Sequence, residues 1–528
     1  MKIILSALIY FISLTSIIAQ FSGVRLNTDE AQESYTLYCD DSNTYVINNC
    51  GSIVNSWPFG RNNYHLHPKL LKNGNLIALF NDFIDGITIK EYNWSGSLLA
   101  GVKIQDNNII HHYEVIKLDN GNYLTAGREV LSLNEISDLG YQVGVETASG
   151  GSANPSYMDM ILEVDPQGNS VWKWNIKDHM IQERDPGLPN YGIIAEHPEL
   201  LDMDGPLQAT DWSFTESFMI NSFDYNADLD QIAISVRKMS EIIIIDHSTT
   251  TEEAAGSTGG NSGKGGDILW RWGNPENYGQ GNQNDRQLYY QHNPNWIEHG
   301  PYTGMLTCYN NGRDRPISSF DNRYSNVPII DTKINSDGSY NMQAGSFDYE
   351  LVNNYLGTEE ELDFYSSYTS GAKVLPNGNI HITVGQNGQR SRMLEVTQEG
   401  DKVWDYEIED SDYIYRSEKY SIDHPAFVGK DLSVKGQIES NYNCELYTAT
   451  VELAVDLIIH YDVFPDHIAI QSGNLISYTV IDATGKLFLN GSTNTSTHNI
   501  DISRLTKGIY FLTFVAENRN THTVKFLK

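Results

Sequence analysis

A short hairpin motif occurs three times in this chain and constrains the fold more than any other feature. Each copy has apolar residues, then Asn-Gly-Asn, then further apolar residues; the copies lie at Asn73-Gly74-Asn75, Asn120-Gly121-Asn122 and Asn377-Gly378-Asn379. Asn-Gly between strand-like runs is typical of a tight β-hairpin turn, because both central residues tolerate positive φ. The three copies therefore predict equivalent hairpins in different repeats of one ring.

A second element recurs with the first one. It is an apolar strand, a glycine turn and then a strand that carries tryptophan, and its copies lead to Trp57, Trp172 and Trp404. Two hairpins in each unit make a four-stranded sheet, and such sheets repeated around an axis make a β-propeller. Helical periodicity is nearly absent. We therefore predict an all-β fold of the propeller type, with a β-sandwich or a β-helix as the alternatives.

Composition and charge narrow the class of partner. The chain has 528 residues and a formal net charge of −33. Binding to phosphate backbones needs an excess of Lys and Arg, so this balance argues against nucleic acid as a partner. The count of 43 glycines and 32 tyrosines suits a protein of many turns and aromatic strands.

The N-terminus has the pattern of a secretory signal peptide. Lys2 precedes a largely apolar run from Ile3 to Ile18, and Ala19 is a small residue at a plausible cleavage site. We predict that residues 1–20 are the signal; a membrane anchor is the alternative. We expect no transmembrane segment after cleavage. In an exported chain Cys39 and Cys50 can close a small disulfide loop, and Cys308 with Cys444 is a second possible pair.

A glycine-rich stretch at residues 256–266 interrupts the repeats. It lacks the Gly-Lys-Ser/Thr ending of a phosphate-binding P-loop, because Gly265 follows Lys264. We therefore interpret this stretch as a long exposed loop.

The pattern changes after about residue 430. Residues 431–458 are predicted to be a linker, and residues 459–528 alternate as strands of a small β-sandwich. The segments Asp482-x-x-Gly485-Lys486 and Leu505-x-x-Gly508-Ile509-Tyr510-Phe511 resemble the C-terminal sorting domain of bacterial type IX secretion cargo. This resemblance implies a protein that is secreted or held at the cell surface, with the type IX secretion machinery as a partner.

Polar residues share one register in the hairpin repeats. His65 and His112 each lie nine residues before the glycine of the turn, and Thr369 has this position in the third copy. Equal register predicts equal placement at the start of the inner strands, where these side chains can form a polar site. Alternatively, they form hydrogen bonds between neighbouring blades.

Segments across residues 30–425 resemble the bacterial arylsulfate sulfotransferases. The clearest are His111-His112-Tyr113-Glu114, Arg271-Trp272-Gly273-Asn274-Pro275, Gln291-His292 and Asn310-Asn311-Gly312. The resemblance implies a six-bladed propeller over residues 21–430. It also implies transfer of a sulfuryl group from an aryl sulfate to a phenolic acceptor, without a cofactor.

The resemblance assigns roles to three residues of the candidate site. His292 would donate a hydrogen bond to the sulfuryl oxygens or the leaving phenolate. Arg315 would hold the sulfuryl oxygens through its fork of donors, and His112 would complete the catalytic group. Alternatively, His292 is a buried structural histidine and Arg315 is a surface charge. The sequence leaves metal binding open.

The chain departs from the family pattern at two places. The segment from Asp211 to Ser222 lacks the family's histidine, and Gly385–Arg390 stands where the family has the histidine that becomes sulfated. His381 is nearby, but strand alternation does not place it on the channel side. A second hypothesis is therefore a catalytically inactive propeller that binds a small molecule, glycan or protein at the cell surface.

Overall fold

The computed structural model describes most of the chain between residues 23 and 527. The described ranges are 23–60, 67–82, 86–106, 108–141, 157–205, 218–316, 323–357, 364–387, 390–408, 414–438, 449–452, 458–463, 467–472, 476–482, 486–493, 497–506, 508–516 and 521–527. The expected signal peptide lies outside them. Regular structure within these ranges is almost entirely β-strand, and the two α-helices, α1 (Leu133–Asp138) and α2 (Thr251–Ala254), are short. None of the helices described is long and apolar enough to cross a membrane.

Six antiparallel sheets of four or five strands occur between residues 23 and 437 of the described chain. The first and second sheets consist of β5 (Lys69–Leu70), β6 (Leu76–Asp82), β7 (Gly86–Tyr92) and β8 (Leu98–Val102), and of β9 (Ile109–Lys117), β10 (Tyr123–Val130), β11 (Tyr157–Val164) and β12 (Ser170–Asn175). The third and fourth consist of β15 (Ile220–Asn226), β16 (Gln231–Val236), β17 (Glu241–Asp246) and β18 (Trp270–Trp272), and of β19 (His292–Trp296), β20 (Leu306–Tyr309), β21 (Asn326–Asp331) and β24 (Glu350–Leu356). The fifth and sixth consist of β25 (Gly371–Val374), β26 (Ile380–Asn387), β27 (Arg390–Val396), β28 (Lys402–Ile408) and β1 (Gly23–Asn27), and of β29 (Ser417–Ser421), β2 (Ser34–Cys39), β3 (Thr44–Asn48), β4 (Ser52–Trp57) and β30 (Gly436–Gln437).

Each of these sheets shares a buried apolar cluster with the next, and the last sheet shares one with the first. Strands β16 and β17 show how the sequence achieves this. Ile234 and Ile243 pack toward the sheet of β9–β12, whereas Ala233 and Ile244 pack toward the sheet of β19–β24. Successive side chains of a strand point to opposite faces, so a strand buried on both faces reads as the continuous apolar run Ile242–Ile245.

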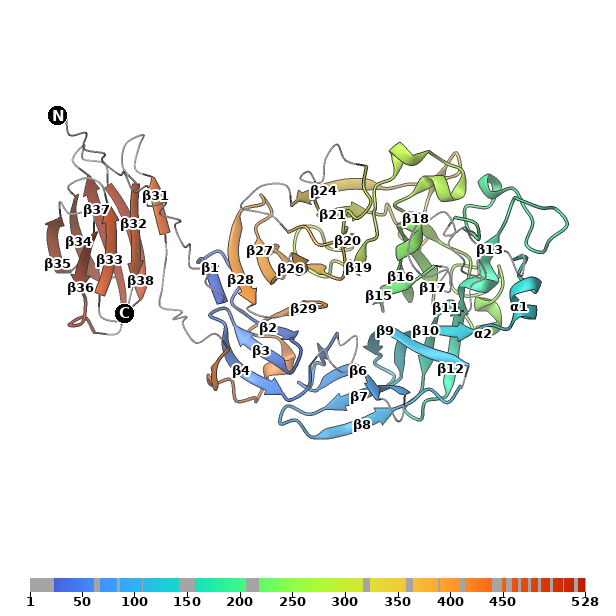
Figure 1. The fold of residues 1–528 in the computed structure, drawn as a ribbon, viewed down its shortest axis with the longest axis horizontal. Helices are drawn as coiled ribbons and strands as arrows, with labels where there is room; N and C mark the ends of the chain where they lie inside the picture. Colours follow the sequence, from blue (N-terminus) through green and yellow to red (C-terminus); the bar gives the residue numbers. More distant parts are fainter. Residues whose placement is uncertain are drawn as a thin grey trace, which may run out of the picture.

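The two ends of this region meet in shared sheets. Strand β1 pairs with β28 through Gly23 and Glu407, and β2 pairs with β29 through Ser34 and Ser421. Each of these two sheets therefore combines strands from the start of the chain with strands from its later part. Figure 1 shows the sheets around a common centre, with β9, β15, β19 and β29 on the inner side.

The Asn-Gly turns lie at equivalent places in three different sheets, as predicted. They join β5 to β6, β9 to β10 and β25 to β26. The expected turn type is wrong in one respect, because only the glycine adopts positive φ: 81° at Gly74, 91° at Gly121 and 88° at Gly378. The loops are longer than two residues, closing for instance through Leu71 and Asn75, and a type I turn followed by a left-handed glycine suits that length.

The last asparagine of each motif supports contacts between neighbouring sheets. Its side-chain amide donates to a buried glutamate on the third strand of its own sheet, and that glutamate meets a basic side chain from the next sheet. The sets are Asn75, Glu91 and Lys117; Asn122, Glu163 and His247; and Asn379, Glu395 and Lys419. The motif thus encodes both a turn and a polar link between sheets.

The cysteine pairing differs from the expected small loop. Cys39 carries a buried thiol in β2, whereas Cys50 is disulfide-bonded. Cys308 is also a buried thiol, and burial raises its pKa above the ordinary value. The Cys39–Cys50 bridge is therefore wrong, because the side chain of Cys39 lies in the apolar core.

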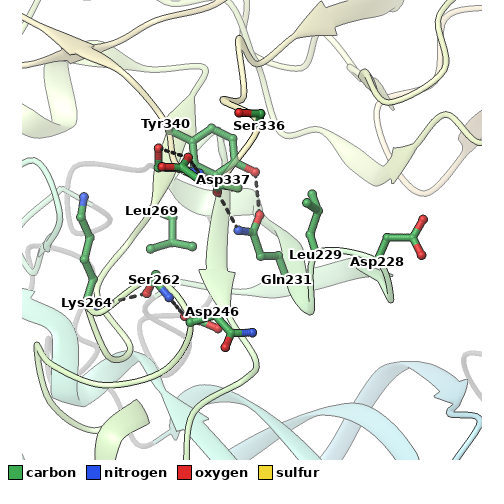
Figure 2. A pocket seen from close by; sticks show the side chains of 13 residues that line it. Asp228, Leu229, Gln231, Asp246, Ser262, Lys264, Leu269, Ser336, Asp337 and Tyr340 are labelled. Atoms are coloured by element: carbon green, nitrogen blue, oxygen red, sulfur yellow. Dashed lines mark hydrogen bonds between the residues drawn. The ribbon is translucent and has the colours of Figure 1, made fainter.

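The glycine-rich stretch at residues 256–266 is exposed at its tip, as expected, but it is held in place. Residues 261–264 are exposed, and the Ser262 amide donates to Asp246 Oδ2 at 2.8 Å. Figure 2 shows Ser262 and Lys264 on one side of a cavity of about 490 Å³, with Asp337 and Tyr340 on the other. The cavity separates this loop from the turn at residues 336–340.

Residues 449–527 contain two further four-stranded sheets in the described ranges. One sheet has the order β31 (Ala449–Glu452), β32 (Ile458–Val463), β33 (His467–Ser472) and β36 (Thr497–Asp501). The other has the order β35 (Leu487–Thr493), β34 (Ile476–Asp482), β37 (Ile509–Ala516) and β38 (Thr521–Leu527).

Candidate active site

His292 begins β19, the inner strand of its sheet, at a point where the backbone is strained. Tyr290 and Asn293 have φ values of 58° and 55°, and Thr369 and Ser370, which lead into β25 of the neighbouring sheet, have 52° and 79°. Non-glycine residues with such φ values cost free energy and cluster at functional sites. The strained backbone at Tyr290 and Asn293, before and after His292 in the chain, therefore marks this end of β19 as a candidate site.

Asn311 orients the His292 ring. His292 Nδ1 lies 2.6 Å from Asn311 Oδ1, while Asn311 Nδ2 donates to the carbonyls of Ser366 and Thr369 at 2.8 and 3.0 Å. Because the amide nitrogen is used by two carbonyls, the amide oxygen accepts from Nδ1–H. The neutral ring then has its lone pair on Nε2.

His292 is held neutral by its surroundings. Its side chain is buried, and burial lowers the pKa to about 3, with the guanidinium of Arg237 as the next cause and that of Arg416 contributing further. A histidine flanked by two cations stays unprotonated at neutral pH. A neutral imidazole of this kind can act as a nucleophile or a base.

Two arginines share aromatic partners beside His292. The Arg237 and Arg313 guanidinium carbons lie 4.7 and 5.3 Å from the centre of the Tyr290 ring, and Arg313 also lies 4.8 Å from the centre of Tyr368. The flat guanidinium stacks well on aromatic faces. Tyr368 is 45% exposed, so this group reaches solvent.

A buried ion network lies next to the site at the centre of the ring. Glu114 on β9 receives Arg416 Nη1 at 2.9 Å, Lys69 Nζ at 2.7 Å and His67 Nδ1 at 2.9 Å. His67 Nε2 lies 3.1 Å from Glu418 Oε1. Burial by itself would raise the pKa of Glu114, but Lys69, Arg416 and His67 together hold it well below its ordinary value.

This network adjoins a cavity on the side of the Asn-Gly turns. The cavity has a volume of about 590 Å³, and Lys69, Asp224, Asn293, Lys373 and Glu418 are among its lining residues. Burial raises the pKa of Asp224 to about 6. Charged side chains from four inner strands and an asparagine from a fifth therefore face the centre.

Arg315 has different partners from those expected. Its guanidinium lies between the rings of Tyr289 and Tyr324, at 4.9 and 4.1 Å, and donates to Tyr324 Oη and Asn326 Oδ1. It is neither a free surface charge nor, among its described contacts, a partner of His292. Arg315 supports the segment that leads into Tyr290.

Of the other predicted site residues, the structure describes the side chains of Thr369 and His381 but not those of His112 and His65. His112 lies in β9 and its backbone pairs with Ala126 of β10, but its side chain is outside what the structure describes, as are His65 and residues 206–217 and 388–389. Thr369 contributes its carbonyl to Asn311, as noted above. His381 lies between sheets, with Nε2 2.8 Å from Ser417 Oγ, and therefore belongs to a sheet interface.

Sequence reasoning missed Arg237, Arg313 and Arg416. None of them occurs in a repeated motif, and they come from three different sheets or loops. Asn311 belongs to the Asn310-Asn311-Gly312 segment, which resembles the family pattern. Its role could not be predicted, because it depends on contacts with residues 366–369, which are distant in the sequence. Among the described residues no group of three His, Cys, Asp or Glu side chains is placed to hold a metal ion.

These observations define a class: an all-β protein of repeated antiparallel sheets with a histidine, arginine and tyrosine site at the centre. Its sequence from residue 27 to 447 matches the model of the arylsulfotransferase (ASST) family, and the chain belongs to this family. Residues 464–528 match the secretion system C-terminal sorting domain. The protein is therefore one that the secretion machinery exports, to the medium or to the cell surface.

Solved structures resemble the chain only distantly. PorZ, a surface component of the type IX secretion system of Porphyromonas gingivalis, is 11% identical, with a TM-score of 0.25 over 96% of this chain and 70% of PorZ. The Pseudomonas aeruginosa periplasmic gluconolactonase PpgL is 8% identical, with a TM-score of 0.33 over 88% of this chain and 99% of PpgL. A search of curated proteins found no match.

Proposed function

We propose that this protein transfers a sulfuryl group from an aryl sulfate ester to a phenolic acceptor at the His292 site. Family membership supports the reaction class. The observation that carries the assignment to this site is the neutral, buried His292, oriented by Asn311 and flanked by Arg237 and Arg416. Phenolic acceptors and aryl sulfate donors are anions or weak acids, which suit a cationic and aromatic site.

The orientation of His292 favours a nucleophile over the hydrogen-bond donor expected from the sequence. Its Nδ1–H is engaged by Asn311, so Nε2 offers a lone pair. In the first step the Nε2–S bond forms as the bond from sulfur to the aryl oxygen breaks, and the phenolate leaves and takes a proton from solvent. In the second step the acceptor oxygen attacks sulfur, the N–S bond breaks and leaves its electron pair on Nε2, and the phenolic proton of the acceptor passes to solvent.

The arginines fit the charge that this transfer develops. Charge spreads over the sulfuryl oxygens, as in phosphoryl transfer, and preorganised cations stabilise it. Arg237 and Arg313, which stack on the Tyr290 ring, are cations of this kind outside the buried network, and the exposed Tyr368 ring offers a face for the aryl group. Arg315 is a positioning residue in this scheme, and His112 remains a predicted member of the site.

We also propose the domain arrangement that this function requires. The six sheets form the six blades of one propeller over residues 21–430, and the closed cycle of shared apolar clusters supports this count. Residues 431–458 link it to the sorting domain at 459–528, where the two C-terminal sheets pack as a β-sandwich. Residues 1–20 act as the signal peptide.

The test is an assay of phenol release from a chromogenic aryl sulfate, with and without a second phenol, between about pH 6 and 9. We expect transfer by the wild-type protein and none by His292→Ala. Intact-mass analysis after donor treatment should show one added sulfuryl group that maps to His292. Binding of the aryl sulfate without transfer at any pH would support the inactive binding protein instead.

A further inference from the structure

We propose that Arg416 holds a tetrahedral oxyanion at the centre of the ring through its Nε and Nη2 atoms. For the reaction above, the ligand is the sulfuryl group of the aryl sulfate. That identification rests on the proposed function, whereas the anion site itself rests on the contacts described next.

The Arg416 guanidinium is buried, and only one of its nitrogens is hydrogen-bonded. The side chain is 2% exposed, and Nη1 donates to Glu114 Oε2 at 2.9 Å, with His67 Nδ1 at 3.3 Å. Nε and Nη2 have no hydrogen-bond partner among the described residues. Buried charged donors without partners lose their hydration without replacement, and native proteins rarely leave them so. A group from outside the chain is the natural partner.

The two unpartnered nitrogens form one edge of the guanidinium. Nε–H and the adjacent Nη2–H are parallel donors, spaced to bind two oxygens of a carboxylate, sulfate or phosphate. The bond from Nη1 to Glu114 fixes the orientation of that edge. The Glu114 carboxylate also binds Lys69 and His67, so its negative charge is shared among three basic side chains and does not fully neutralise Arg416.

The surroundings place the Arg416 side chain near the segment that follows His292. A Cβ atom at Gly371 would lie 2.8 and 2.9 Å from Cγ and Cδ of Arg416, and 2.6 Å from Asn293 Oδ1. Glycine at this position of β25 therefore leaves the space through which the Arg416 side chain passes. Asn293 directly follows His292, and the positive charge of Arg416 is one of the causes that keep His292 neutral.

The experiment measures binding of inorganic sulfate to the full-length protein by calorimetry, with chloride at matched ionic strength as the reference. Arg416→Lys keeps a cation opposite Glu114 but removes the paired donors, so we expect sulfate binding at least about ten-fold weaker. Arg392→Lys is the matched control. Arg392 Nε and Nη2 already bind Asp405 at 2.7 and 2.5 Å, so this variant should bind sulfate as the wild type does.

A second variant guards against loss of folding in Arg416→Lys. Gly371→Ala keeps Arg416 but displaces its side chain, and we expect it to weaken sulfate binding too. Gly101→Ala is the control, because a Cβ there meets no atom within 4 Å. Sulfate binding by Gly371→Ala and Arg416→Lys that equals the wild type would overturn the proposal, as would a wild-type protein that binds no sulfate.

The outcomes separate this inference from the proposed reaction. Sulfate binding that depends on Arg416, in a protein that never transfers a sulfuryl group, would support the anion site and contradict the reaction. Transfer with unchanged kcat and KM in Arg416→Lys would support the reaction and overturn the role of Arg416. Inorganic phosphate serves as a competing probe. Equal competition would identify a site for tetrahedral oxyanions in general, and weak competition one that prefers sulfate.

Discussion

Lys419 Nζ lies 2.5 Å from Glu395 Oε2, and both side chains are completely buried between two neighbouring sheets. The pair joins β29 to β27 and recurs in altered form in two other sheets, as Glu91 with Lys117 and Glu163 with His247. It shows how the hairpin repeats are connected to one another.

Replacing Lys419 by methionine should destabilise the protein strongly. The change leaves the Glu395 carboxylate buried with only the Asn379 amide and the Gln32 backbone amide as described partners, and removing one member of a buried pair costs about 3–5 kcal/mol. Urea unfolding measures the loss. Lys333→Met is the control, because Lys333 pairs with Asp331 and Glu350 at the surface, where such ion pairs contribute little to stability. Similar losses in both variants would contradict the role of the buried pair.

His247 should make stability depend on pH near neutrality. Burial would lower its pKa, but Glu163 and Asp230 outweigh burial and raise it. A raised folded pKa gives stability that is fully present below the unfolded value of about 6.5 and is lost as pH rises through the folded value. We expect the unfolding free energy of the wild type to fall over that range more than that of His247→Gln. Parallel pH curves for the two proteins would rule this out.

For the proposed transferase, we expect protonation of His292 to cause no fall in kcat/KM above about pH 5. Its pKa is lowered to about 3, so the neutral ring persists far below the ordinary range. Asn311→Asp places a carboxylate at Nδ1, which favours the charged ring and raises this pKa. The acidic limb of kcat/KM should then move toward neutral pH, while Asn310→Asp serves as a neighbouring control. A wild-type limb near pH 6.5 would show that His292 is not held neutral.

Removal of residues 459–528 should leave the melting temperature of the remaining chain almost unchanged. Among the described residues, the strands of the two C-terminal sheets pair only within their own sheets, and they share no strand with the six sheets of residues 23–437. Scanning calorimetry of the full and shortened chains measures the effect. Deletion of β1 is the comparison, because its loss exposes the edge of β28, and we expect it to lower the melting temperature by several degrees. A large fall on C-terminal deletion would show that the sorting domain supports the ring.

The local features of the fold were predictable from sequence because they depend on neighbours in the chain. Gly74, Gly121 and Gly378 occupy left-handed positions that turn chemistry demands, and alternation along strands set which residues are buried. The absence of long helices from the described ranges followed from the same periodicity. The disulfide was not predictable, because cysteine spacing does not say which side chains meet in space.

The candidate site was predictable only in part. The resemblance pointed to His292, and the structure gives that residue a buried, neutral and oriented ring. It also pointed to Arg315, whose guanidinium is instead engaged by Tyr289, Tyr324 and Asn326. Spacing from a glycine turn says how far along the chain an arginine lies, but not which aromatic ring it stacks on.

By itself, the sequence determined the repeats, the all-β class, the sorting domain and the histidine most suited to chemistry. Only the tertiary structure decided that Arg237, Arg313 and Arg416 gather around that histidine, and that Asn311 selects its tautomer. The reason is physical: turns and strand alternation are set by interactions within a few residues. The charge and orientation of a buried side chain depend on groups that meet only when the ring of sheets has closed.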